Sequence, residues 1–346
     1  MMTVQQSKIY GALLGAAVGD SMGTVSEGFS PEFLKKRYGG YITDLEQPTD
    51  DGMTINARAG MVSDDFSVAY YTAEVMLENQ SRMNREMAVK GVLRWWEHPE
   101  YTCYVGPSTR NGIMKLIDPS KAVSNNSPLK CINGLASNGS GMKSGIMGVF
   151  NPHNMDAAID DTITMCSITH NNPISLSAAC AVSAATARAF DEGVGYYDIL
   201  EAGLYGAREG YRKTFGTMAH IAGCNVEKKM HQAIEIGFRY QGDFEKAMIQ
   251  IADIVGCGLY AYEAIPGCFG MIAACKGDLM QTLHMGVNAG SDADSLACMV
   301  GYILGALHGE APIPRKFFAM IDKENNFDLK KMALDIDAMI RGWADE

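Results

Sequence analysis

The chain has 346 residues, of which 47% are hydrophobic and 20% charged, and its formal net charge at pH 7 is −11. This composition is that of a soluble globular protein long enough to bury a large core. The negative charge excludes nucleic acid as the main partner, because phosphate backbones are bound by clustered Lys and Arg. The densest basic run, Lys35-Lys36-Arg37, has three residues and is typical of a solvated face.

The cysteines and the N-terminal segment bear on location. The nine cysteines are scattered, and no two have CxxC spacing, which favours buried free thiols in a reducing compartment. The apolar stretch 9–19 follows a single basic residue, Lys8, and runs into Asp20 without the cleavage site of a signal peptide. No stretch is long and uncharged enough to span a bilayer. We therefore expect a cytoplasmic protein with no membrane partner.

Helical spacing of Ala, Leu, Met and Gly dominates the chain, and alternating strand patterns are scarce. In the first predicted helix, Gly11, Gly15, Gly19 and Gly23 share one face, which would let another backbone approach closely. Pro, Asn and Ser mark loops at 46–58, 124–128, 133–141 and 151–154. The predicted helices are 7–23, 65–79, 83–97, 173–191, 196–213, 226–238, 243–263, 267–275, 278–288 and 293–308.

The domain organisation follows from the same reading. No low-complexity linker separates two halves of the chain, and no repeat of fixed period is present. The sequence therefore predicts one mainly α-helical domain over residues 1–346.

Two acidic clusters stand immediately before strongly apolar helical runs. Ser63-Asp64-Asp65 precedes the helix at 65–79, and Asp292-Ala293-Asp294-Ser295 opens the helix at 293–308. Taken alone, each cluster fits an N-cap with acids in the first turn. If the two helix starts meet, four crowded carboxylates would repel one another. A hard cation with oxygen ligands, such as magnesium, manganese or calcium, would relieve that repulsion. Sequence spacing leaves both interpretations open.

Further motifs accompany the acidic clusters in a fixed order along the chain. They are 10–20 with Gly23 and Glu27, then Ser63-Asp64-Asp65, Gly106-Pro107-Ser108-Thr109, Asn138-Gly139-Ser140-Gly141-Met142-Lys143, Thr169-His170-Asn171-Asn172-Pro173 and 288–295. Together these motifs resemble the ADP-ribosylglycohydrolase family over almost the whole chain. The resemblance implies an all-α, single-domain orthogonal helical bundle with a dinuclear metal site.

The resemblance also implies roles for individual residues. Two divalent cations, Mg²⁺ or Mn²⁺, are the implied cofactors. Glu27 and Asp292 are the implied catalytic residues. The implied metal ligands are Ser63, Asp64, Asp65, Asp292, Asp294 and Ser295. The implied substrate-binding residues are Gly106, Pro107, Asn138, Gly139, Ser140, Met142 and His170.

The chain departs from the family pattern at several of these motifs. Ser63 and Ser295 stand where threonine is usual, and each keeps a hydroxyl oxygen. Ser291 and Ala293 replace the usual Gly and Thr, and Lys143 stands where Arg is common. These changes predict that metal binding is retained while the pocket around the metals is reshaped.

The implied activity is metal-dependent hydrolysis of an N- or O-glycosidic bond at the anomeric carbon of a ribose. Metal-activated water would attack, and Glu27 would orient or deprotonate that water. The implied substrate is ADP-ribosylated, either a small molecule or one attached to a protein. One alternative is an N-ribosidase acting on a small nucleoside or nucleotide-sugar. The other is a non-catalytic relative that binds ADP-ribose or serves structurally; the near-complete ligand set argues against it.

Overall fold

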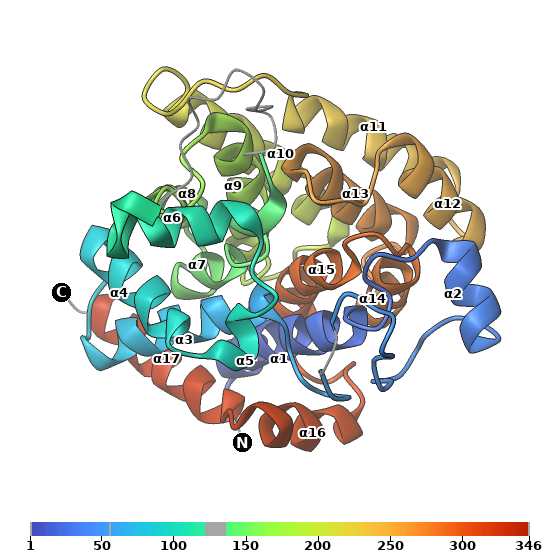
Figure 1. The fold of residues 1–346 in the computed structure, drawn as a ribbon, viewed down its shortest axis with the longest axis horizontal. Coiled ribbons are helices and arrows are strands. Elements are labelled where there is room, and N and C mark those ends of the chain that lie inside the picture. The colour runs from blue at the N-terminus through green and yellow to red at the C-terminus, as the bar shows by residue number, and fades with distance from the viewer. Residues whose placement is uncertain (1, 55–56, 122–135, 345–346) are drawn as a thin grey trace.

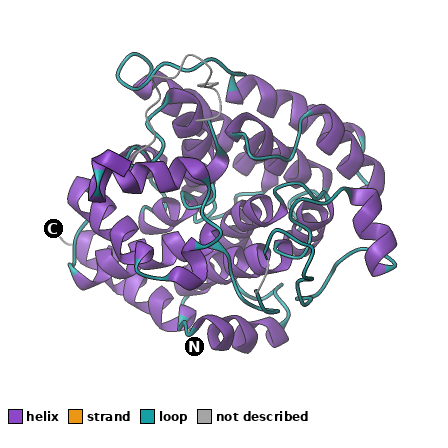
Figure 2. Ribbon diagram, viewed as in Figure 1, coloured by secondary structure: helices purple, strands orange, loops and turns teal. Residues whose placement is uncertain are grey.

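A computed structural model describes residues 2–54, 57–121 and 136–344 of the chain. Within these ranges the regular secondary structure is helical (Figure 2). The one β-type contact among the described residues is an isolated bridge between Ser137 and Tyr260. The predicted all-α fold is therefore confirmed. No helix among the described residues is both long and apolar enough to cross a membrane.

The described residues form seventeen α-helices and two short 3₁₀ turns (Figure 1). The helices are α1 Val4–Gly23, α2 Pro31–Tyr38, α3 Asp64–Glu78, α4 Arg85–Trp96, α5 Pro99–Thr102, α6 Pro107–Ile117, α7 Gly145–Phe150, α8 Met155–Cys166, α9 Pro173–Arg188, α10 Tyr196–Thr214, α11 Val226–Arg239, α12 Phe244–Ile254, α13 Ala261–Ala274, α14 Leu279–Asn288, α15 Ala293–His308, α16 Arg315–Asn325 and α17 Leu329–Ala344. The 3₁₀ turns are η1 Pro119–Lys121 and η3 Asn138–Ser140.

Two predicted boundaries are wrong. The helix predicted at 243–263 is two helices, α12 and α13, separated by a loop in which Gly256 has a φ of +94°. That left-handed conformation turns the chain and ends the helical run. The helix predicted at 267–275 begins earlier, at Ala261, and continues through Pro266. The loop predicted at 124–128 lies outside the described residues, as do the first residues of the loop at 133–141.

Several helices of the structure have no counterpart in the prediction, among them α2, α6, α8, α16 and α17. Most of these are short or carry many polar residues. Helix α17 is the exception, because its buried residues Leu329, Met332, Ala333 and Ile336 follow the apolar spacing of an amphipathic helix.

The glycine face of α1 packs directly on α15, and the two helices run antiparallel through the interior (Figure 1). A Cβ atom added at Gly19 would lie 2.2 Å from the carbonyl oxygen of Ala297, and one at Gly23 would lie 2.3 Å from the Cα of Asp294. The predicted close approach of a second backbone is confirmed. Its consequence is that the end of α1 and the start of α15 lie at the same point in the molecule.

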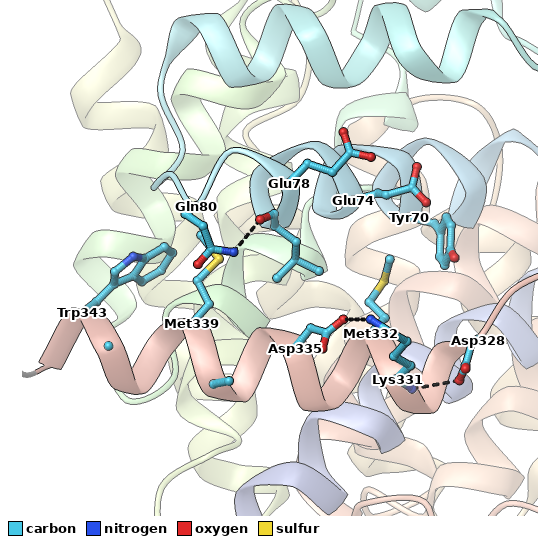
Figure 3. A pocket seen from close by; sticks show the side chains of 13 residues that line it. Tyr70, Glu74, Glu78, Gln80, Asp328, Lys331, Met332, Asp335, Met339 and Trp343 are labelled. Carbon is cyan, nitrogen blue, oxygen red and sulfur yellow. Dashed lines mark hydrogen bonds and ion pairs between the residues drawn. The ribbon is translucent and has the colours of Figure 1, made fainter.

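A surface hollow of about 760 Å³ lies between α3 and α17 (Figure 3). Its walls combine methionine and aromatic side chains with charged residues that are ion-paired: Arg94 on α4 contacts Glu78 at 2.9 Å and Glu74 at 3.3 Å, and Lys331 contacts Asp335. The groove flanks the C-terminal half of α3. The acidic cluster lies at the opposite end of the same helix.

Candidate metal centre

The centre forms where the last turns of α1 meet the first turn of α3. Asp20 on α1 is fully buried, and its two carboxylate oxygens accept hydrogen bonds from the backbone N–H groups of Ser63 and Phe66, each at 2.8 Å. Unpaired N–H groups at a helix start attract negative charge. Asp20 therefore fixes the start of α3 against α1.

The two sequence clusters are in direct contact. The hydroxyl of Ser295, on α15, donates to Asp65 Oδ1 at 2.6 Å. Ser63 is the N-cap of α3; its Oγ accepts from the Asp65 backbone N–H at 3.2 Å and lies 3.0 Å from Asp65 Oδ2. The two helix starts therefore meet, a question that the sequence spacing had left open. The capping interpretation also holds for Ser63.

The second cluster does not behave as a cap. Asp292 occupies the N-cap position of α15, but its side chain makes no capping hydrogen bond. Its Oδ2 accepts instead from Asn138 Nδ2 at 2.7 Å. The backbone holds this pair in place: the N–H of Asn138 donates to Leu259 and that of Asp292 donates to Cys257. The Asp292 carboxylate thus faces the centre, away from its own helix.

A tight turn before α15 brings Glu27 to the same place. Ser291 has a φ of +59°, and its backbone pairs with the loop after α1 through the Gly28 N–H to Ser291 carbonyl bond at 2.7 Å and the Ser291 N–H to Phe29 carbonyl bond at 2.9 Å. A Cβ on Gly290 would lie 2.0 Å from the carbonyl oxygen of Phe29, so this approach requires glycine. Glu27 therefore joins the acidic side chains of all three helix ends.

Six carboxylates lie together here, those of Asp20, Glu27, Asp64, Asp65, Asp292 and Asp294. No lysine or arginine of the described residues forms an ion pair with any of them. Burial raises the pKa of Asp20 to about 6 and that of Asp64 to about 7. Burial, and then repulsion by Asp292 and Asp64, raises the pKa of Glu27 to about 8. Burial also raises the pKa values of Asp65, Asp292 and Asp294.

The oxygen atoms of this cluster suit divalent cations. Oxygens of Asp20, Asp65 and Asp294 lie within 4.8 Å of one another, and so do oxygens of Glu27, Asp292 and Asp294. Asp294 belongs to both groups, so the two candidate sites adjoin. Oxygen-only donors with several negative charges fit Mg²⁺, Mn²⁺ or Ca²⁺. The donor set is therefore compatible with the two cations that the sequence resemblance implies.

A cavity of about 240 Å³ opens beside the cluster. Predicted site residues that line it are Glu27, Asp64, Asp65, Gly106, Pro107, Asn138, Gly139, Met142, Asp292, Asp294 and Ser295. Three predicted site residues do not line it: Ser63 caps α3, Ser140 donates its hydroxyl to the Ser175 carbonyl at 2.8 Å, and His170 is 1% exposed. Contact of Ser140 and His170 with a ligand stays a prediction.

Residues that the sequence prediction left out also form this site. Asp20 is the most consequential, and a signal for it existed, because it is the only charged residue between Lys8 and Glu27. Tyr104, Ser137, Leu259 and Tyr260 also line the cavity.

A second hollow of about 560 Å³ adjoins the centre and shares Glu27, Leu259 and Asp292 with the first. Its further lining includes Glu263 and Asp253, whose carboxylates form no hydrogen bond or ion pair with the described residues, and the apolar side chains of Phe29 and Met53. The acidic centre thus lies between two hollows of different volume.

The fold and site define an all-α protein with a buried acidic centre suited to divalent cations. Comparison with known proteins then identifies its family: the ADP-ribosylglycohydrolase family matches residues 1–346, so the chain belongs to that family. A solved structure titled ADP-ribosylglycohydrolase-related protein complex superposes with a TM-score of 0.69 at 19% identity, covering 98% of this chain and 100% of the other.

Three relatives match over most of their length. The uncharacterized protein YegU of Escherichia coli K12 is 25% identical, with 95% of this chain and 96% of YegU covered. An ADP-ribosylarginine hydrolase of Pseudomonas putida is 23% identical, with 96% and 81% covered. The ADP-ribosyl-[dinitrogen reductase] glycohydrolase of Rhodospirillum rubrum is 21% identical, with 95% and 94% covered. Family membership indicates a glycohydrolase.

Proposed function

We propose that the chain is a divalent-cation-dependent hydrolase that cleaves the bond between the anomeric carbon of ADP-ribose and an attached nitrogen or oxygen. The observation that carries this proposal is a cluster of six acids, none of which forms an ion pair with a lysine or arginine of the described residues. Burying one such charge costs several kcal/mol unless it is compensated. Six buried carboxylates would therefore destabilise a protein that no longer binds a cation.

The acidic side chains would divide the work between holding cations and handling a proton. Asp20, Asp64, Asp65, Asp292 and Asp294 would hold the cations, with the hydroxyls of Ser63 and Ser295 beside them. When bound, such a pair supplies Lewis acidity toward a water molecule and the ribose hydroxyls. The carboxylates would also favour the positive charge that develops on the sugar in an oxocarbenium-like transition state.

Glu27 is the group best placed to take a proton. It is the least buried of the six acids and lines both hollows, so its carboxylate can reach a water at the boundary between them. Burial and repulsion by neighbouring acids raise its pKa to about 8 in the cation-free protein, and bound cations would lower this pKa toward neutral pH, where a general base is most effective. Glu27 Oε would accept the proton of the attacking water.

The two hollows suggest how a substrate lies across the centre. The ribosyl group would occupy the 240 Å³ cavity, where Asn138 and Gly139 offer polar contacts. The leaving group would extend past Glu27 and Asp292 into the 560 Å³ hollow. The relatives named as ADP-ribosyl hydrolases support the ADP-ribose part of the proposal.

A substrate panel tests this function. Peptides carrying ADP-ribosyl-arginine or ADP-ribosyl-serine, and small N-ribosides, are incubated with Mg²⁺, with Mn²⁺ or with a chelator, and released ADP-ribose or ribose is measured. We expect cation-dependent release of ADP-ribose and a large loss in Asp292→Asn. Turnover of small N-ribosides alone would point to an N-ribosidase. Binding of ADP-ribose without release from any substrate would identify a non-catalytic relative. Full activity in chelator would contradict the metal-dependent scheme.

A further inference from the structure

A buried chain of polar side chains leads away from Ser137, which lines the same cavity as the carboxylates. Lys143 Nζ donates to Thr169 Oγ1 at 2.8 Å, and Thr169 Oγ1 lies 2.8 Å from His170 Nδ1. The other ring nitrogen, His170 Nε2, lies 2.9 Å from Ser137 Oγ. Lys143 and His170 are 4% and 1% exposed, whereas Ser137 is half-buried and lines the cavity. The chain therefore links a buried amine to the surface that a ligand would touch.

The donor and acceptor capacities of these groups give the chain a direction. An ammonium only donates, so Thr169 Oγ1 accepts from Lys143 and has one proton of its own to give. The acceptor that the described residues offer to that proton is His170 Nδ1. A neutral imidazole whose Nδ1 accepts carries its proton on Nε2. His170 then donates to Ser137 Oγ.

Ser137 is left with a free donor at the cavity. Its Oγ accepts from His170 and has no other hydrogen-bond partner among the described residues. Its hydroxyl proton therefore points to whatever oxygen atom a ligand presents. Successive hydrogen bonds polarise one another, so the positive charge at Lys143 strengthens this final donor.

We propose that this chain is a directed relay, running from Lys143 to Ser137, that makes the Ser137 hydroxyl a fixed donor toward a phosphate oxygen of the ligand. The relay presents a positive end at Ser137, whereas the carboxylates of Glu27, Asp64, Asp65, Asp292 and Asp294 line the same cavity and repel anions. An anionic part of the substrate is thus directed to the Ser137 side. Ser137 would touch the ligand, and His170 and Thr169 would act through it as positioning residues. The choice of ligand rests on the proposed function; the direction of the relay does not.

The tautomer of His170 tests the direction in the ligand-free protein. Nitrogen NMR of ¹⁵N-histidine-labelled protein distinguishes protonated from unprotonated ring nitrogens, and loss of one signal set in His170→Gln assigns His170 among the seven histidines. We expect a neutral ring protonated at Nε2. We also expect Thr169→Val to redistribute the tautomers, whereas Thr169→Ser preserves them. A ring protonated at Nδ1, or at both nitrogens, at neutral pH would overturn the relay.

Calorimetry with ADP-ribose and Mg²⁺ tests its effect on a ligand. We expect Ser137→Ala to weaken ADP-ribose binding about 10- to 100-fold, the size of a hydrogen bond to a charged acceptor. Thr169→Val should weaken binding although residue 169 does not line the cavity, and Thr169→Ser should bind as the unmodified protein does. In Ser137→Ala, adding Thr169→Val should change the affinity little further, because both act through one hydroxyl.

The outcomes separate the relay from the proposed function. Additive losses in the double variant, or a loss below about threefold in Ser137→Ala, would contradict the relay because a merely structural role predicts them. If the unmodified protein binds no ADP-ribose, the proposed function fails, and the His170 tautomer still decides the relay.

Discussion

Helix α3 carries acidic residues at both ends, and the two ends treat their charges differently. At its C-terminal end lies Glu78, which is labelled in Figure 3 and is half exposed. Glu78 is ion-paired with Arg94, and this contact lowers the pKa of Glu78. At its N-terminal end Asp64 and Asp65 are buried and form no ion pair with the described residues, and burial raises their pKa values. The surface acid Glu78 already has a positively charged partner within the protein. The buried acids need a partner from outside the chain, which is the physical basis for proposing a metal centre.

The sharpest test of this difference removes one charge from each end. Asp65→Asn should lower activity about 1,000-fold and weaken cation binding, because a few kcal/mol of transition-state stabilisation depends on the centre and each 1.4 kcal/mol is tenfold in rate. Glu78→Gln, an isosteric change in the same helix, should leave both properties unchanged. Steady-state kinetics and metal titration provide the measurements. Equal effects of the two substitutions would contradict the proposed difference between the N-terminal and C-terminal ends of α3.

The packing that assembles the centre can be tested with two glycines. Gly19→Ala should destabilise the protein by about 3 kcal/mol, because its Cβ would stand 2.2 Å from the Ala297 carbonyl oxygen and would force α1 away from α15. Gly342→Ala in α17 has no atom within 4 Å of the added Cβ. It should stabilise the protein slightly, by up to about 1 kcal/mol, through helix propensity. Urea unfolding measures both, and similar values for the two variants would contradict the close-packing argument.

The raised pKa values predict an unusual pH dependence of stability in the cation-free protein. The folded state holds protons on Asp20, Asp64 and Glu27 up to about pH 6, 7 and 8, whereas the unfolded chain releases them near pH 4. Since the folded state binds more protons over this window, unfolding free energy should fall as pH rises from about 4 to 8. Mg²⁺ should therefore raise Tm more at pH 8 than at pH 5.5.

Thermal unfolding in chelator and in Mg²⁺ across this range measures the effect. Because Glu78→Gln leaves the buried acids intact, it serves as the control and should show the same pH profile as the unmodified protein. A Mg²⁺ effect that does not grow with pH would indicate that the cation binds elsewhere.

The smallest expected effect is on the stability contributed by the ion pair at the C-terminal end of α3. Glu78→Gln should cost less than about 1 kcal/mol, since exposed ion pairs contribute little and salt screens them. Raising the salt concentration should shrink the difference between this variant and the unmodified protein, as urea unfolding would show. A loss of several kcal/mol in unfolding free energy would mean that the Glu78–Arg94 ion pair is more than an exposed surface contact.

Local sequence determined much of this protein. Apolar helical spacing predicted an all-α fold, and the four-residue glycine repeat predicted the close contact of α1 with another backbone, because both depend on residues a few positions apart. The two acidic clusters could be located for the same reason. Helix α17 also had a readable apolar pattern, although the prediction omitted it.

Only the tertiary structure decided which groups meet and what they do there. Asp292 sits at an N-cap position yet bonds to Asn138, more than 150 residues away in the chain, so spacing could not exclude the capping interpretation. Asp20 joins the centre because α1 packs on α15, and His170 contacts Ser137, which lines the cavity. Long-range contacts set the burial of these groups, and burial gives a carboxylate or an imidazole the pKa and the partner on which its chemistry depends.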